Sequence, residues 1–232
     1  MNYQEFLSSK FPFFARFFRE FRLKQLSKKS TQEVFTDIYV KNTWKSTESV
    51  SGLGSTMEHT RTIRKELPQL VNDFKINTFL DLPCGDFNWM KEVSLPVAKY
   101  IGGDIVADII RRNNSKYATN IISFVQLNLI ESELPDADVL FCRDCLVHLS
   151  FKDIGKGIRN IKSSKIIYLL TTTFPNIDAS EDIITGRWRR LNLQKPPFNY
   201  PTPVILIEEN GRTDIDRKCL GLWLVSDINA PQ

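Results

Sequence analysis

From Ile76 onward, five short runs rich in β-branched and aromatic residues alternate with helical or polar stretches, and this alternation constrains the fold more than any other feature. Strands that alternate with helices along a chain pair in parallel, because each crossover returns the chain to the same edge of the sheet. The sequence therefore predicts an α/β fold with a mostly parallel sheet and helices on both faces. The expected strands are 76–82, 98–104, 121–127, 138–142 and 165–172, and the expected helices between them include 106–117 and 151–161.

The pattern changes after Phe174. A long polar stretch with several prolines runs to Tyr200, and two further β-rich runs follow at 204–208 and 220–226, with a turn signal between them. Two strands joined by a turn pair antiparallel. We therefore expect a C-terminal antiparallel hairpin added to the parallel sheet.

The first thirty residues differ in composition from the rest of the chain. They hold seven Lys or Arg, two Glu and seven of the sixteen phenylalanines, whereas the net charge of the whole chain is only +4. On a helix that begins near Pro12, an arc of about 140° collects the aromatic side chains. These are Phe13, Phe14, Phe17, Phe18 and Phe21. Such a basic amphipathic helix can lie on an anionic membrane surface; the alternative is that it packs on the globular body or on a second copy of the chain.

Charge and hydropathy also bear on partners and location. Outside the leader the chain is close to neutral, so we expect no nucleic-acid partner. No stretch approaches the roughly 18 apolar residues of a membrane-spanning helix, and the pattern of a secretory signal is absent. We expect a cytoplasmic protein that lies at the inner face of a membrane if the leader docks there.

The segment 79–87 carries the most informative motif. An apolar strand ends in Asp81, and a tight turn containing Gly85 is expected to open a helix, so that backbone N–H groups can approach a ligand. A dinucleotide-binding turn needs three spaced glycines, which disfavours NAD. The next strand ends in Asp104, where a carboxylate can accept hydrogen bonds from both ribose hydroxyls of a nucleoside. The third strand runs into Asn128, whose amide can pair with adenine.

With these residues in this order, the chain resembles the class I S-adenosylmethionine-dependent methyltransferases over residues 76–173. The resemblance implies a Rossmann-like sheet, S-adenosylmethionine as the cofactor, and a first turn that holds the methionine part. Pro83 and Phe87 depart from the family's pattern, since they replace its first and last glycines. The residues that the resemblance places around the cofactor are Trp44, Ser55, Arg61, Asp81, Pro83, Cys84, Gly85, Trp89, Asp104, Ile105, Asn128, Leu129 and Arg143.

A narrower resemblance is to a methyltransferase subgroup associated with surface-polysaccharide synthesis, in which similar domains are fused to glycosyltransferases. It implies a sugar or glycan hydroxyl as the acceptor. It also implies that the small-residue loop and the helix after it, with Arg61 facing inward, close over the cofactor; the alternative is a flexible linker and a surface helix. The segments that carry this resemblance are Trp44 with 51–56, then 81–90, 142–150 and 188–198.

Residues that follow the fourth expected strand are candidates for catalysis. A sugar hydroxyl is a poor nucleophile, and a positioned base contributes roughly 10²- to 10⁴-fold. We interpret His148 as the base, with Asp144 as its orienting partner if helical geometry begins there, or Asp144 as the base directly. A packed histidine is the alternative for His148, and His59 is the weaker candidate. Cys142 and Cys145 have CxxC spacing, but further ligands are missing, so no metal site is expected.

The long connection 176–200 is a candidate acceptor site. Arg187, Trp188 and Asn192 offer an aromatic face and polar donors of the kind that bind sugar rings. Arg189 and Arg190 add to the same set. The alternative is a solvated basic turn with its tryptophan in the core.

Three segments and one activity follow from these interpretations. We expect a leader helix (1–30), a cofactor-capping loop and helix (31–75) and a methyltransferase domain (76–232). The expected activity is methyl transfer from S-adenosylmethionine to a sugar or glycan hydroxyl, with membrane or glycosyltransferase association through residues 1–30. The alternatives are a methyltransferase acting on a small metabolite or RNA, and a non-catalytic cofactor-binding module of a biosynthetic complex.

Overall fold

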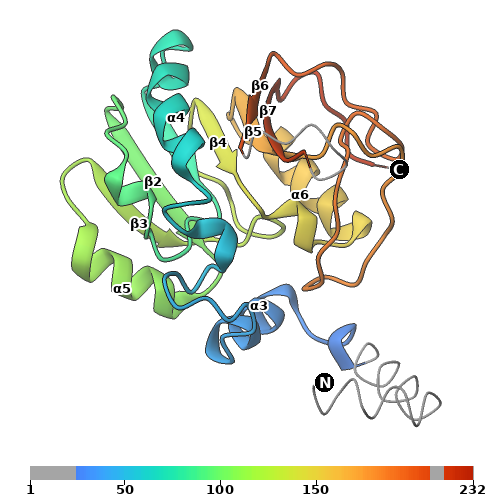
Figure 1. Cartoon of the computed structure of the whole chain (residues 1–232), viewed down its shortest axis with the longest axis horizontal. Coiled ribbons are helices and arrows are strands. Elements are labelled where there is room, and N and C mark those ends of the chain that lie inside the picture. Colours follow the sequence, from blue (N-terminus) through green and yellow to red (C-terminus); the bar gives the residue numbers. More distant parts are fainter. Residues whose placement is uncertain (1–24, 210–216, 232) are drawn as a thin grey trace.

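The computed structural model describes residues 25–209 and 217–231 (Figure 1). Residues 1–24 of the expected leader and the turn of the C-terminal hairpin lie outside these ranges. The described chain forms one seven-stranded sheet in the order β3-β2-β1-β4-β5-β7-β6. Its strands are β1 (Thr78–Asp81), β2 (Lys99–Asp104), β3 (Ile122–Gln126), β4 (Val139–Cys142), β5 (Tyr168–Thr173), β6 (Ile205–Glu208) and β7 (Cys219–Leu224).

The first five strands are parallel, and β7 pairs antiparallel with both β5 and β6. The order reverses between β1 and β4, because the chain runs outward from β1 to β3 and then returns to the other side of β1. Ligands of open parallel sheets bind at the carboxyl ends of the strands at such a reversal. The expected α/β fold with a terminal antiparallel hairpin is confirmed, and it places Asp81, Asp104 and Arg143 at one edge.

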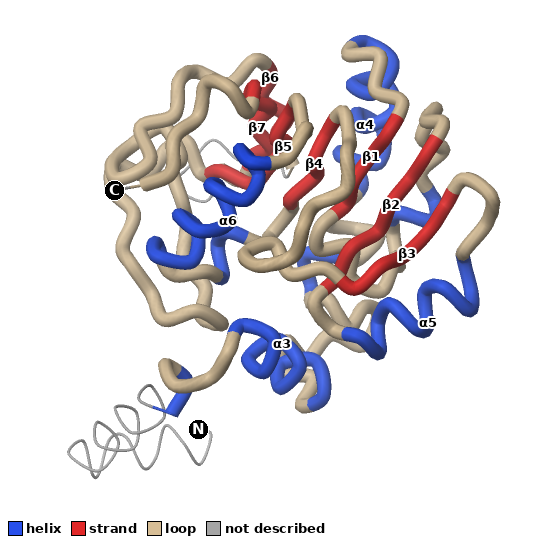
Figure 2. Tube along the Cα trace, turned by 180° about the vertical axis from the view of Figure 1, so that it is seen from behind, coloured by secondary structure: helices blue, strands red, loops and turns tan. Residues whose placement is uncertain are grey.

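Two hydrophobic clusters cover the two faces of the sheet, and alternation along β1 assigns its side chains between them. Phe79 belongs to the cluster under helix α4 (Arg61–Asp73), and Leu80 belongs to the cluster under helix α6 (Phe151–Ser163). Figure 2 shows these helices on opposite sides of the strands. On α6 the side chains Ile154, Ile158 and Ile161 are fully buried, and each such burial contributes on the order of 1.5–3 kcal/mol.

The remaining helices flank the carboxyl edge. Helix α5 (Ala107–Tyr117) packs along β2 and β3, and helix α3 (Thr31–Val40) lies at the edge itself (Figure 1). Ser30 caps α3, since its side chain accepts from the backbone N–H of Glu33 while the Glu33 carboxylate accepts from the backbone N–H of Ser30. The capping box gives α3 a defined start beside the sheet.

Two helices differ from the sequence expectation. The helix expected directly after the small-residue loop begins only at Arg61, because the hydroxyls of Thr56 and Thr60 bond back to carbonyls at 2.9 and 2.8 Å and close separate turns before it. The helix expected to open at Gly85 is wrong: only a 3₁₀ turn, Met90–Glu92, lies between β1 and β2. Phe87 adopts a left-handed backbone (φ 58°), which interrupts any helix there.

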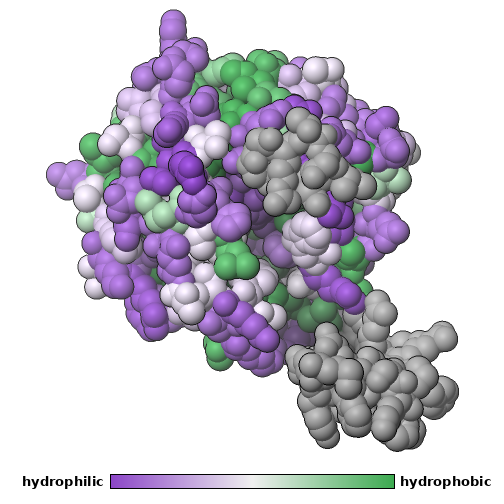
Figure 3. Space-filling view, in the orientation of Figure 1, coloured by the Kyte–Doolittle hydropathy of each residue, from purple (hydrophilic) through white to green (hydrophobic). Residues whose placement is uncertain are grey.

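None of the helices in the described ranges is long and apolar enough to cross a membrane. The face seen in Figure 3 is mostly hydrophilic, with apolar residues scattered over it.

Candidate active site

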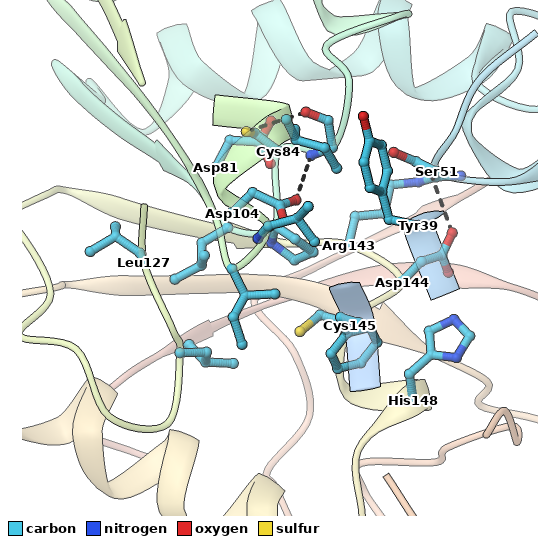
Figure 4. Close-up of a pocket in the computed structure, with 18 of the residues that line it drawn as sticks. Tyr39, Ser51, Asp81, Cys84, Asp104, Leu127, Arg143, Asp144, Cys145 and His148 are labelled. Atoms are coloured by element: carbon cyan, nitrogen blue, oxygen red, sulfur yellow. Dashed lines mark hydrogen bonds and ion pairs between the residues drawn. The ribbon is translucent and has the colours of Figure 1, made fainter. Parts of the chain in front are cut away.

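A cavity of about 1110 Å³, which includes open solvent at its mouth, opens at the carboxyl edge where the strand order reverses. Its walls come from the ends of β1 to β4, from α3 and from the loop before α4. Figure 4 shows Asp81, Cys84 and Asp104 toward one end of the cavity and Asp144 and His148 toward the other.

Of the thirteen residues expected around a cofactor, twelve line this cavity. They are Trp44, Ser55, Asp81, Pro83, Cys84, Gly85, Trp89, Asp104, Ile105, Asn128, Leu129 and Arg143. Arg61 does not, and the expectation that it faces inward is wrong. Its side chain is 61% exposed and pairs with Glu58 at the start of α4, because the helix turns this face to solvent.

The turn after β1 is held by the small-residue loop in front of it. Gly85 has a φ of 55°, and a Cβ added there would lie 2.1 Å from the Ser51 hydroxyl oxygen. The Asp86 carboxylate accepts from the Val50 backbone N–H and from the Ser49 hydroxyl, both at 2.9 Å. Only glycine fits at position 85, since a side chain would push the loop away. The loop and the turn thus form one unit over this end of the cavity.

Asp104 at the end of β2 is 5% exposed and accepts two backbone N–H groups. Val106 donates to Oδ1 at 2.9 Å and Gly85 donates to Oδ2 at 3.2 Å. Burial raises the pKa of this carboxyl to about 6, although the two backbone donors oppose the shift. Asp104 is therefore mainly ionised at pH 7 and fixed in orientation beside the first turn.

Asp81 at the end of β1 has a different protonation. It is 3% exposed, and the Tyr100 hydroxyl donates to Oδ2. Burial raises the pKa of Asp81 to about 8, which the hydrogen bond from Tyr100 only partly offsets. The free protein thus carries a protonated carboxyl in this cavity at neutral pH.

Asn128 after β3 lines the cavity, but its amide is engaged in its own turn. Nδ2 donates to the Glu131 carboxylate at 3.0 Å, and Oδ1 accepts from the Ile130 backbone N–H at 3.0 Å. A nucleobase such as adenine could pair with the Asn128 amide only if it replaced the contact with Glu131.

Four charged groups gather at the end of β4, and two of them, Glu209 and Lys218, were not found from the sequence. Arg143 donates from Nε and Nη2 to one Glu209 carboxylate oxygen at 3.0 and 2.6 Å, and from Nη2 to the Gly54 carbonyl at 2.8 Å. The guanidinium also lies over the Trp89 ring, 5.7 Å from its centroid. Arg143 is fully paired in this arrangement, and it ties the loop over the cavity to the hairpin.

Asp144 is anchored by the same cluster. Lys218 Nζ lies 2.6 Å from its Oδ2, and Arg143 Nη1 lies 3.3 Å from the same oxygen. Burial alone would raise the pKa of Asp144, but the two cations hold it well below its usual range. Asp144 is consequently a persistent anion and a weak base.

The expected pairing of Asp144 with His148 is not present. Asp144 has a left-handed backbone (φ 52°), and His148 ends a 3₁₀ turn, Leu146–His148, so no α-helical face joins them. His148 Nδ1 instead contacts the Arg187 backbone carbonyl oxygen at 2.9 Å. A carbonyl only accepts, so Nδ1 carries the proton and Nε2 keeps its lone pair in the neutral ring. Burial lowers the pKa of His148 and favours that neutral form.

Helix α3 supplies a wall that no motif indicated. Thr31, Phe35 and Tyr39 line the cavity from this helix. The Tyr39 hydroxyl donates to Asp108 on α5 and fixes the helix across the mouth. A periodic apolar pattern alone does not tell whether a helix faces a core or a ligand.

The expected acceptor residues of the 176–200 loop lie outside this cavity. Asn192 is 2% exposed, and its amide donates to the carbonyls of Pro175 and Ile177. Arg187 is exposed and contributes its backbone carbonyl to His148, and Trp188 packs edge-on against Phe174 with half of its surface in solvent.

Arg189 and His59, which the sequence analysis considered as candidate site residues, also lie outside the cavity lining. Arg189 is buried and donates to the carbonyls of Leu146 and Leu149, which supports the turn that carries His148. His59 is exposed and contacts the Thr56 hydroxyl. Within residues 25–209 and 217–231, no group of three or more potential ligand side chains could hold a metal ion.

Comparisons with known proteins place this fold. No family model matches the chain, and no curated protein matches it in sequence. Solved structures do match. The N-methyltransferase NodS from Bradyrhizobium japonicum WM9, in complex with S-adenosyl-L-homocysteine, is 12% identical with a TM-score of 0.57, over 80% of this chain and 97% of that one.

Two other solved structures agree with that result. A SAM-dependent methyltransferase from Leishmania major is 12% identical with a TM-score of 0.58, over 81% of this chain and 82% of its own. Magnesium protoporphyrin IX methyltransferase from Synechocystis PCC 6803, with bound SAM, is 12% identical with a TM-score of 0.54, over 84% and 97%. The fold is thus that of the class I methyltransferase structures.

Proposed function

We propose that the protein transfers a methyl group from S-adenosylmethionine to a hydroxyl of a sugar or glycan. The observation that carries the proposal is the His148 imidazole, which lies with a free Nε2 lone pair in the same cavity as Asp81 and Asp104. NodS and the Synechocystis enzyme are methyltransferases with this fold, and their structures contain S-adenosyl-L-homocysteine and SAM.

The cavity fits a positively charged cofactor. The carboxyl groups of Asp81, Asp86, Asp104 and Asp144 line it, against the single guanidinium of Arg143 among the described lining residues. That guanidinium is already paired with Glu209. A cation would lower the cost of ionising Asp81, whereas an anion would find no unpaired positive partner.

In this proposal each residue has a separate task. The turn of Gly85 and the carboxylate of Asp104 would hold the cofactor, which supplies an electrophilic methyl carbon on a sulfonium sulfur. His148 accepts the proton of the acceptor hydroxyl at Nε2 as the oxygen attacks, and Arg187 keeps its Nδ1–H in place. Holding the hydroxyl in line with the methyl carbon supplies much of the acceleration, because the displacement needs little covalent help.

The acceptor end of the cavity favours an uncharged ring. Trp44 contributes aromatic surface there, beside His148, and the ionised Asp144, whose charge Lys218 and Arg143 offset, offers oxygens that accept hydrogen bonds. Sugar rings present an apolar face and hydroxyls that can donate to such a carboxylate. A neutral small metabolite with a hydroxyl is the second candidate, and RNA is disfavoured because the chain outside residues 1–30 carries no net positive charge.

The acceptor class is tested with S-adenosylmethionine labelled in its methyl group. The full chain is incubated with a neutral glycoside, the uronide of the same aglycone, a phenol and an RNA oligonucleotide, with heat-inactivated protein as control. We expect label in the neutral glycoside, as a methyl ether that survives mild alkali. Label confined to the phenol or RNA, or an alkali-labile methyl ester on the uronide, would refute a sugar hydroxyl as the acceptor. Protein that neither binds the cofactor nor transfers label would refute the enzyme.

The proposed location is the inner face of a membrane, reached through the basic, phenylalanine-rich residues 1–30. Each cationic residue near an anionic surface contributes on the order of 1 kcal/mol. Sedimentation with vesicles that contain phosphatidylserine tests this against neutral vesicles. Association with a glycosyltransferase or with a second copy of the chain is the alternative, and failure to sediment with either vesicle type would favour it.

A further inference from the structure

The His148 imidazole is enclosed by two groups from distant parts of the chain. On one side the Arg187 carbonyl oxygen accepts from Nδ1 at 2.9 Å. On the other side lies the indole of Trp44, with ring centroids 5.4 Å apart and planes tilted by 39°. Rotation of the imidazole would break the first contact and change the second. The ring is therefore held in one orientation, with Nε2 available to the cavity.

The backbone around Trp44 is shaped to hold that indole in place. Its neighbours Asn42 and Lys45 both have left-handed backbones, with φ of 43° and 51°. The indole packs on Gly52, where an added Cβ would lie 3.2 Å from the Trp44 Cβ. Left-handed backbone at non-glycine residues persists where the surroundings enforce it. Two such positions and one close glycine contact flank the Trp44 side chain.

From this geometry we propose that Trp44 is a positioning residue for His148: its indole fixes the imidazole orientation and keeps water from it, and it does not contribute to cofactor affinity. The inference rests on the proposed function, in which His148 is the base. It also reassigns Trp44, which the sequence placed among the cofactor-binding residues. The cavity lining is compatible with both roles, but the ring contact is with His148.

The charged groups that face His148 come from three other elements. Asp144 at the end of β4 and the Arg187 carbonyl favour the protonated ring, whereas Arg189 and Lys218 disfavour it. Burial acts in the same direction as these cations and lowers the pKa most. Trp44 contributes to that burial. A tryptophan face also attracts a cation, which would oppose the effect. At a 39° tilt the indole covers the imidazole more as a shield against water than as a facing π surface.

The experiment is a nuclear magnetic resonance titration of the two histidines in the full chain without acceptor. The chain has only His59 and His148, and exposed His59 serves as an internal reference. In Trp44→Ala we expect the titration midpoint of His148 to move to higher pH, while that of His59 stays. Trp44→Phe should give a smaller change in the same direction, because it keeps a ring. Trp188→Ala removes a tryptophan outside the cavity, and we expect it to leave both midpoints where they are.

Binding of S-adenosyl-L-homocysteine to the same variants completes the test. We expect its affinity for Trp44→Ala to stay within a few-fold of wild type. A tenfold loss of affinity would overturn the proposal in favour of a cofactor-binding role. An unchanged or lowered His148 midpoint in both Trp44 variants would overturn it as well, the latter because attraction of the cation would then dominate. If Trp44→Ala does not fold, Trp44→Phe carries both measurements. Neither readout needs turnover, so a failure of the proposed methyl transfer is recognised separately.

Discussion

Binding of a cationic cofactor should release a proton from Asp81. This carboxyl lines the cavity, is buried, and has a pKa of about 8 in the free protein, compared with 3.8 when unperturbed. At pH 7 about nine in ten molecules therefore hold a proton on Asp81. A positive charge in the cavity favours the ionised form, so the proton leaves as the cofactor binds.

The magnitude follows from linkage. Close to 0.9 proton should be released per cofactor bound at pH 7, and affinity should rise nearly tenfold between pH 6 and pH 7. Below about pH 6, Asp104 adds to the dependence, since its own pKa is about 6. Asp81→Asn removes the titrating group while it keeps an oxygen that can accept from the Tyr100 hydroxyl. Asp81→Asn should therefore lack the proton release that comes from Asp81, and its affinity for the cofactor should rise less between pH 6 and pH 7.

Calorimetry of S-adenosylmethionine binding in phosphate and in Tris at pH 7 measures the release, because the two buffers differ in ionisation enthalpy. The amino group of the cofactor and His148 can also exchange protons on binding, and the difference between wild type and Asp81→Asn isolates the contribution of Asp81. Identical proton release by the two proteins would refute the reasoning. It would mean either that Asp81 is already ionised in the free protein or that the positive charge binds elsewhere.

Three further changes test other parts of the site. Asp104→Ala should weaken S-adenosylmethionine binding at least tenfold by calorimetry, because hydrogen bonds to a charged group contribute about 1.5–3 kcal/mol each; unchanged affinity would place the nucleoside elsewhere. Arg143→Met should lower the free energy of unfolding in urea by about 3–5 kcal/mol, because it leaves the Glu209 carboxylate buried without its main cation, and adding Glu209→Gln should restore part of the loss. Gly85→Ala should lower both cofactor affinity and the melting temperature, because alanine is strained at a φ of 55° and its Cβ displaces Ser51; a cofactor dissociation constant equal to wild type would show that the loop does not close this site.

The sheet and the cofactor end of the cavity could be predicted because their signals are local. Each strand is a short apolar run, and the residue that ends a parallel strand lies at the carboxyl edge whatever surrounds it. Asp81 and Asp104 follow directly from that rule. Gly85 is identified by the same turn, although the helix expected after it is replaced by a left-handed Phe87 and a 3₁₀ turn.

The end of the cavity near Asp144 and His148 was harder to predict because its contacts are long-range. Lys218 reaches Asp144 across 74 positions of sequence, and Glu209 reaches Arg143 across 66. No spacing rule connects such pairs. The spacing of Asp144 and His148 suggested a shared helical face, but the left-handed backbone at Asp144 separates them. Asn192 was expected to bind the acceptor because it is polar and lies in a long loop, yet its amide satisfies two buried carbonyls.

Single-turnover methyl transfer by His148→Ala tests the central claim most directly. The reaction is followed with the preformed complex of protein and S-adenosylmethionine and a glycoside that the wild type methylates, with His59→Ala as the matched histidine control. We expect His148→Ala to lower the rate constant at least a hundredfold while cofactor affinity stays within a few-fold, because the base acts on the acceptor proton in the transition state. His59→Ala should turn over as wild type does. A His148→Ala rate constant close to that of wild type would contradict the account, since the acceptor hydroxyl would then lose its proton without the imidazole.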